Sequence, residues 1–201
     1  MQIFNILQKR SLFFPDLATS QRPLSSGEKF KLFLADSSAP NVVLSSALGS
    51  AIAQAADSPH GYGQGWDAYA KRFGASMAGN ASSEFFGTFL LASALHQDPR
   101  FFPQWNPTLG GSAKYAIARV FVTRNDEGKK VGNWSGLFGT LLSESLANAY
   151  WPEQDRTAGQ TFRRIGIDFG TRAASNMFRN YWPLIFKDLQ RVTPGLHEPQ
   201  K

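Results

Sequence analysis

The side chains most able to act together lie on two segments whose patterns predict long helices. Arg164, Asp168 and Arg172 are spaced four residues apart, so they share one helical face. Asn80 and Glu84 share a face of the earlier segment in the same way. If these faces meet in a cleft, their charged groups would bind an anionic or polar small molecule. If they face solvent, the same residues would form an ordinary ladder of ion pairs.

Glu84 has three interpretations. It stands between Ser83 and Phe85, beside an apolar run, and a buried carboxylate at that place needs a partner. An arginine of the second long helix is the predicted partner, whereas the alternatives are an exposed side chain and a general base. The predicted ligand-binding set is Arg72, Asn80, Glu84, Arg164, Asp168 and Arg172.

Conventional catalytic motifs are missing from the sequence. His96 and Asp98 suggest acid–base chemistry if both point into one cleft with a third polar group. Alternatively, His96 interacts with a helix C-terminus and Asp98 opens the turn before Pro99. Patterns of the HExxH, GxSxG and phosphate-loop types do not occur. No catalytic, metal or cofactor residues are predicted, and the sequence favours a non-enzymatic role without settling it.

Composition narrows the class of protein. Only 18% of the 201 residues are charged, less than the roughly 25% usual in soluble domains. The absence of cysteine excludes disulfides and thiolate metal sites. The net charge of +6 favours anionic partners such as an anionic membrane surface. Because the basic residues are scattered and no nucleic-acid-reading module occurs, no specific nucleic-acid binding is predicted.

Targeting and membrane signals are weak in the sequence as given. Lys9 and Arg10 follow the first apolar stretch instead of preceding it, so no signal peptide is predicted. The best candidate for a membrane-spanning helix, Trp134 to Tyr150, is interrupted by Glu144. A conventional spanning helix is therefore not expected, whereas contact with a membrane surface stays open.

The hydrophobic pattern predicts a compact all-α bundle of about six helices. They are expected at 25–35, 40–57, 66–95, 112–123, 134–150 and 157–181, the last ending before Pro183, with a strand at 115–122 as an alternative. The predicted organisation is an extended arm (1–24), one helical domain (25–188) and a polar tail (189–201).

An offset of 92 residues reveals a candidate internal repeat. It aligns Arg72-Phe73-Gly74 with Arg164-Ile165-Gly166 and would divide the domain into halves at 28–98 and 112–188. The pairs Gly74/Ala78 and Gly166/Gly170 have the small-xxx-small spacing that lets helix backbones approach closely. The alternative is that helices rich in Ala, Gly and Ser resemble one another by composition.

Several short motifs form a recognisable ordered set. They are Tyr62-Gly63-Gln64-Gly65, Lys71-Arg72-Phe73-Gly74, His96-Gln97-Asp98-Pro99-Arg100-Phe101-Phe102, Arg119-Val120-Phe121-Val122-Thr123, Asn133 with Ser135, Tyr150 with Pro152, and Trp182-Pro183. From about Glu28 to Pro183 the chain resembles a family of helical proteins from acidobacterial and related bacterial genomes, for which no activity is established. The export leaders of that family imply a location in the cell envelope.

Two functional hypotheses follow from the sequence. The first is a non-enzymatic helical protein of the bacterial cell envelope, membrane-associated or scaffolding, which contacts an anionic membrane surface, another envelope protein or its own copies. The second is a small-molecule or lipid-binding module with a polar cleft between the two long helices.

Overall fold

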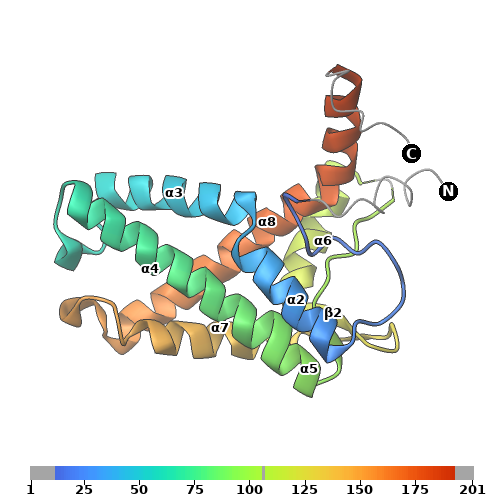
Figure 1. The fold of residues 1–201 in the computed structure, drawn as a ribbon, viewed down its shortest axis with the longest axis horizontal. Coiled ribbons are helices and arrows are strands. Elements are labelled where there is room, and N and C mark those ends of the chain that lie inside the picture. The colour runs from blue at the N-terminus through green and yellow to red at the C-terminus, as the bar shows by residue number, and fades with distance from the viewer. Residues whose placement is uncertain (1–11, 106, 193–201) are drawn as a thin grey trace.

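The computed structural model describes residues 12–105 and 107–192, which form a mostly helical fold (Figure 1). Six helices of twelve or more residues dominate the described part, and a three-stranded sheet lies beside them. The predicted all-α fold class is confirmed. Residues 1–11 of the predicted arm and 193–201 of the predicted tail lie outside the described residues.

Secondary structure follows the predicted order with shifted boundaries. In chain order the elements are α2 (Ser26–Ser37), α3 (Pro40–Ala55), the 3₁₀ helix η1 (His60–Tyr62), α4 (Trp66–Glu84), the π-helix η2 (Phe85–Leu91), α5 (Ala92–Ala94), β1 (Gln97–Asp98), α6 (Leu109–Phe121), β2 (Val122–Asn125), β3 (Lys130–Gly132), α7 (Trp134–Ala147), the 3₁₀ helix η3 (Glu153–Asp155) and α8 (Ala158–Val192).

Helix starts coincide with residues that can cap them. The Ser25 hydroxyl accepts from the backbone N–H of Glu28, and the Glu28 carboxylate accepts from the backbone N–H of Ser25, as the capping box predicts. The Asn133 side chain accepts from the backbone N–H of Gly136 at the start of α7. Local sequence therefore determines where these two helices begin.

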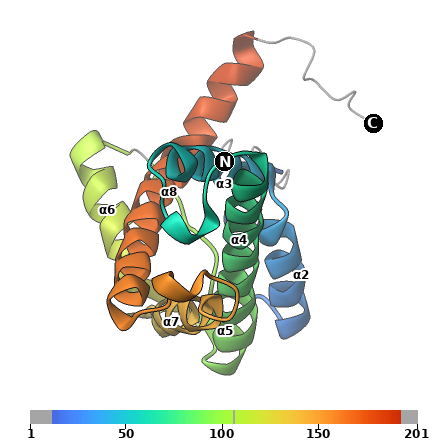
Figure 2. The same ribbon diagram turned by 90° about the vertical axis from the view of Figure 1, so that its left-hand side faces the viewer.

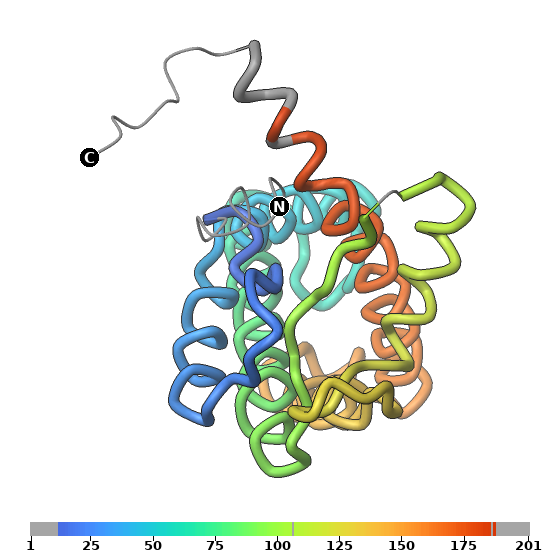
Figure 3. The backbone as a smooth tube through the Cα atoms, turned by 90° about the vertical axis from the view of Figure 1, so that its right-hand side faces the viewer, coloured from blue at the N-terminus to red at the C-terminus, as the bar shows by residue number. Residues whose placement is uncertain are grey.

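The helices surround a common centre. Seen from the end in Figure 2, α3, α4, α7 and α8 lie around the middle of the bundle, with α2 outside α4 and α6 outside α8. The backbone tube in Figure 3 shows the same ring from the opposite end. The closest association between two elements joins α7 to η2, and α6 packs along α8. Segments from both ends of the sequence thus line one interior.

Two predicted boundaries are wrong. The segment 125–132, which falls between two predicted helices, contains most of an antiparallel hairpin, in which Thr123 pairs with Val131. Gly128 makes the turn with a φ of +82°, a conformation that suits glycine. The last helix continues through Pro183 to Val192. Its C-terminal part leaves the bundle at a steep angle (Figure 1). Proline at this position did not end the helix.

The described part of the N-terminal arm packs against the domain. Phe14 and Leu17 form a buried apolar cluster with Phe101, and Leu17 also makes a β-bridge to Phe101. Phe13 stacks on Trp182 of α8 with ring centroids 4.7 Å apart. The arm therefore contacts both the segment after β1 and α8 at Trp182.

The bundle helices expose large apolar side chains and bury small polar ones. α3 buries Ser46 and Ser50, and α7 buries Thr140 and Ser143. The exposed large apolar residues of these two helices are Val43, Leu44, Leu48, Ile52, Trp134, Phe138, Leu141, Leu142 and Leu146. This distribution is the reverse of the usual arrangement in a soluble domain, where such side chains form the core.

Close helix packing occurs at glycines other than the predicted ones. A Cβ on Gly139 of α7 would lie 2.7 Å from both the Cα and the N of Gly87 in η2. A Cβ on Gly74, Gly166 or Gly170 would meet nothing within 4 Å, and all three are exposed. The small-xxx-small packing predicted for those positions is wrong, and the internal repeat stays a prediction.

These two classes of glycine predict opposite effects of a methyl group. We expect Gly139→Ala to lower the free energy of unfolding by roughly 1–3 kcal/mol, because the η2 backbone blocks the new methyl group. Gly74→Ala, which adds the same group at an open helical position, should raise it by up to about 1 kcal/mol. Denaturant titration of both variants measures the difference, and equal effects would contradict the packing at Gly139.

Candidate functional site

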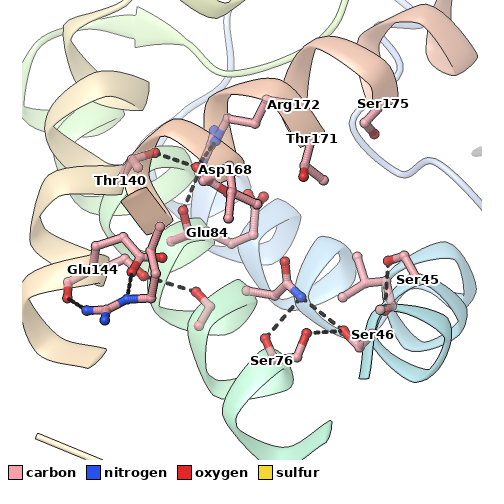
Figure 4. A pocket seen from close by; sticks show the side chains of 18 of the residues that line it. Ser45, Ser46, Ser76, Glu84, Thr140, Glu144, Asp168, Thr171, Arg172 and Ser175 are labelled. Atoms are coloured by element: carbon pink, nitrogen blue, oxygen red, sulfur yellow. Dashed lines mark hydrogen bonds and ion pairs between the residues drawn. The ribbon is translucent and has the colours of Figure 1, made fainter. Parts of the chain in front are cut away.

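A cavity of about 560 Å³ lies between α3, α4, α7 and α8. Its volume is in the range of small-molecule sites, roughly 300–1,000 Å³. Figure 4 shows polar side chains from all four helices facing it. The buried polar faces of these helices thus meet around one space.

Helical periodicity positions the residues of the wall. On α8 the cavity-lining charged residues follow a spacing of four, four and seven, which keeps them on one side of the helix. They are Arg164, Asp168, Arg172 and Arg179. On α4 the corresponding face carries Ser76, Asn80, Ser83 and Glu84.

The structure brings all six predicted ligand-binding residues to this cavity. They are Arg72, Asn80, Glu84, Arg164, Asp168 and Arg172. Their pairing differs from the predicted ladder, because Arg164 does not pair with Asp168 among the described residues. Instead, the Arg172 Nε donates to the Asp168 carboxylate at 2.7 Å, and Thr140 donates to the same carboxylate oxygen at 2.9 Å.

Arg164 joins α8 to α7. Its Nε lies 2.6 Å from the Glu144 carboxylate, and its guanidinium also donates to the backbone carbonyls of Glu144 and Asp155. It stacks over the Trp151 ring at 4.4 Å from the centroid. Burial raises the pKa of Glu144, while the Arg164 hydrogen bond and charge oppose that rise. Removing either group would leave the other without its ion-pair partner.

Arg72 performs a similar task at the start of α4. Its guanidinium donates to the carbonyls of Ser58, Pro59 and Gly63 in the loop before the helix. The side-chain oxygen of Gln54 accepts a further hydrogen bond. Arg72 therefore closes the loop and has few donors left for a ligand, although the sequence predicted it as a binding residue.

Glu84 does not form the predicted ion pair. The Thr88 hydroxyl donates to it, whereas Arg172 donates to Asp168 and Ser83. Burial acts to lower the pKa of Arg172, but the charges of Asp168 and Glu84 outweigh it and raise that pKa. The charge of Glu84 therefore acts on Arg172, but the hydrogen bonds of Arg172 go to Asp168 and Ser83.

Asp36 is a wall residue that sequence reasoning missed. It is 7% exposed and, among the described residues, its carboxyl group has no hydrogen-bond partner. Burial raises its pKa well above the usual range, and the charges of Asp16 and Glu84 act in the same direction. Arg179 opposes this shift. The structure therefore keeps Asp36 protonated to a higher pH than an exposed aspartate.

The missed residues differ in how they could have been found. Asp36 is seven residues after Lys29, so both lie on the buried face of α2, and this spacing is visible in the sequence. By contrast, Asp16 pairs with Arg179 at 2.6 Å across almost the whole chain length. Only the fold brings that pair together.

His96 and Asp98 do not form a catalytic pair. The His96 side chain is exposed, whereas Asp98 is buried in an ion pair with Arg100 at 2.6 Å. Neither lines the cavity. The acid–base hypothesis built on these two residues has no cleft in the described structure. Within the described ranges, no group of three or more His, Cys, Asp and Glu side chains is placed to hold a metal ion.

The chain has no detected similarity to known proteins that bears on this geometry. No protein-family model matches the chain. No curated protein and no solved structure matches it either.

The Arg164–Glu144 pair predicts a large effect of one substitution. We expect Arg164→Met to lower the free energy of unfolding by roughly 3–5 kcal/mol, because Glu144 would stay buried without its partner. The neighbouring Arg163→Met, at an exposed position, should change it by less than about 0.5 kcal/mol. Adding Glu144→Gln to Arg164→Met should restore part of the loss. Similar denaturant midpoints for the two single variants would contradict a stabilising pair.

Asp36 predicts a stability that falls as the pH rises. Its folded-state pKa lies above the unfolded value of about 3.9, so between the two the folded protein holds more protons than the unfolded chain. Stability should therefore decrease with increasing pH across this window. Asp36→Asn should remove that decrease and be the more stable protein at neutral pH, with little difference near pH 4. Melting temperatures from about pH 4 to about pH 8 measure this, and parallel curves would refute it.

Proposed function

We propose that this chain is a non-enzymatic, membrane-associated helical protein of the cell envelope. The observation that carries the proposal is the inverted distribution of side chains, with charge inside the bundle and apolar residues outside. The transfer of apolar surface from water to an apolar environment is favourable by about 25 cal/mol of free energy per Å². Lipid acyl chains supply such an environment.

The apolar exterior extends around the bundle. Besides α3 and α7, the outer faces of α6 and α8 carry exposed large apolar side chains, namely Leu109, Ile117, Phe121, Phe162, Phe178, Leu184 and Ile185. In Figure 2, α3, α7 and the packed pair of α6 and α8 occupy three different sides of the molecule. A symmetric dimer would cover one such patch and leave the others exposed to water. The distribution therefore favours lipid over a second copy of the chain.

Other surface features suit a membrane interface. Trp66 and Trp134 are exposed at the first residues of α4 and α7, and tryptophan is enriched where membrane meets water. Lys31, Lys114 and Arg163 are exposed without an ion pair to the described residues, so they can attract anionic headgroups. Across the described ranges, none of the helices combines the length and the hydropathy that crossing a bilayer requires.

The cavity favours a second function that is compatible with the first. We propose that the bundle also binds a small polar molecule between its helices. The support is the convergence of unpaired polar atoms on one space: the Asn41 amide oxygen, the Ser50 hydroxyl and the Tyr150 hydroxyl are buried on its wall without hydrogen-bond partners. Buried polar groups are normally satisfied, so these atoms are available to a ligand.

Membrane association predicts that outer apolar residues control partition to lipid. We expect the full chain to float with phospholipid vesicles and to resist a high-pH carbonate wash. A variant of α3 with Leu44→Gln, Leu48→Gln and Ile52→Gln should bind vesicles roughly tenfold or more weakly, because three exposed apolar side chains leave the lipid contact.

The control replaces exposed polar residues with glutamine. A variant with Asp67→Gln, Lys71→Gln and Glu127→Gln carries the same number of changes and should float like the wild type. Far-ultraviolet circular dichroism checks that both variants keep their helices. Recovery of the wild type in the carbonate supernatant, or equal flotation of the α3 variant, would overturn the proposal.

A further inference from the structure

The charges on the cavity wall do not balance in pairs. Five acidic residues line the cavity: Asp16, Asp36, Glu84, Glu144 and Asp168. Three of them pair with arginines of α8, since Glu144 pairs with Arg164, Asp168 with Arg172 and Asp16 with Arg179. Asp36 and Glu84 form no ion pair with the described residues. Two carboxyl groups therefore face the cavity without an ion-pair partner.

The other arginines of the wall are engaged elsewhere. Arg72 donates to the carbonyls of the loop before α4, as described above. Arg119 donates to the backbone carbonyls of Val122 and Arg100 at 2.9 and 2.8 Å. Neither forms an ion pair with Asp36 or Glu84 among the described residues.

The wall carries unsatisfied donors as well as acceptors, since the Nε atoms of Arg119 and Arg179 are buried without a hydrogen-bond acceptor, but Asp36 and Glu84 are carboxyl groups. Asp36 is more than nine-tenths buried with no hydrogen-bond partner among the described residues, and Glu84 points into the pocket in Figure 4. One carboxylate oxygen of Asp16 and the amide oxygen of Asn41 are also buried on the wall without donors. The part of a ligand that meets Asp36 and Glu84 must bring N–H donors.

We infer that the cavity binds a small organic ammonium ion, whose N–H groups donate to the carboxyl groups of Asp36 and Glu84. The inference rests on the proposed binding function of the cavity and names the class of its ligand. A space of about 560 Å³ is far larger than a bare metal ion, and the described residues offer no cluster of metal ligands. An anion placed against Asp36 and Glu84 would meet acceptors where it needs donors.

Binding of an ammonium ion should displace a proton from Asp36. Asp36 is subject to the charges of Asp16 from the arm, Glu84 from α4 and Arg179 from α8. The segments η2 and α5, which also pack on α2, contain no ionisable side chain. A cation beside Asp36 favours its ionised form, so the protein exchanges a proton for the ligand.

Titration calorimetry of the purified full chain tests this with butylammonium as the probe. We expect binding whose affinity rises by up to tenfold per pH unit while Asp36 still holds its proton in the free protein. Measurements in two buffers of different ionisation enthalpy should show release of up to one proton. Tetramethylammonium, which has no N–H donor, should bind at least about tenfold more weakly.

Two cavity variants and one matched control localise the effect. Glu84→Gln should weaken butylammonium binding roughly tenfold or more, because a charged acceptor becomes neutral. Asp36→Asn should abolish both the proton release and the pH dependence. Asp67→Asn, an exposed carboxylate on the same helix as Glu84, should bind like the wild type.

Butyrate and butanol separate failure of the ligand class from failure of the site. If butyrate or butanol binds in the cavity and butylammonium does not, the binding function stands and the ammonium inference is overturned. If none of the three binds at any pH, both fall. Proton release that persists in Asp36→Asn would also overturn the exchange at this residue.

Discussion

The cavity-lining arginines of α8 impose the main constraint on this fold. Arg164, Arg172 and Arg179 project from one side of the helix toward the interior, and each contacts a carboxylate. A buried guanidinium without a partner costs several kcal/mol, so the partners must lie where these side chains reach. Because Glu144 belongs to α7 and Asp16 to the arm, the ion pairs position both segments against α8.

A charged interior has consequences for the exterior. Residues that face the bundle axis are short and polar, such as Ser46, Ser50 and Thr140, and the large apolar side chains of the same helices point outward. Short side chains cannot fill the centre, and the arginines hold their partners against the wall. The space left is the cavity. The open interior and the apolar surface are therefore two results of one helical pattern.

The two ends of the cavity have different roles in this description. At one end, Arg72 and Arg164 hold the loops that precede their helices, and Tyr62 and Trp151 of these loops lie with ring centroids 6.3 Å apart. Here the charges are satisfied within the protein. At the other end, Asp36 and Glu84 have no ion-pair partner among the described residues, although the charge of Arg179 acts on both.

Periodicity and capping in the chain were sufficient to predict the helical class, most helix positions and the six polar residues that line the cavity. This succeeded because a spacing of four residues places side chains on one helical face whatever the tertiary context. Local pattern failed where distant parts of the chain decide the outcome. It paired Arg164 with Asp168, whereas the fold supplies Glu144, and it assigned close packing to Gly74, whereas Gly139 meets η2. It also missed Asp36, whose lack of an ion-pair partner depends on which arginines reach the cavity and what they bond there. Faces are properties of one helix, but partners, burial and unbalanced charge are properties of the packed bundle.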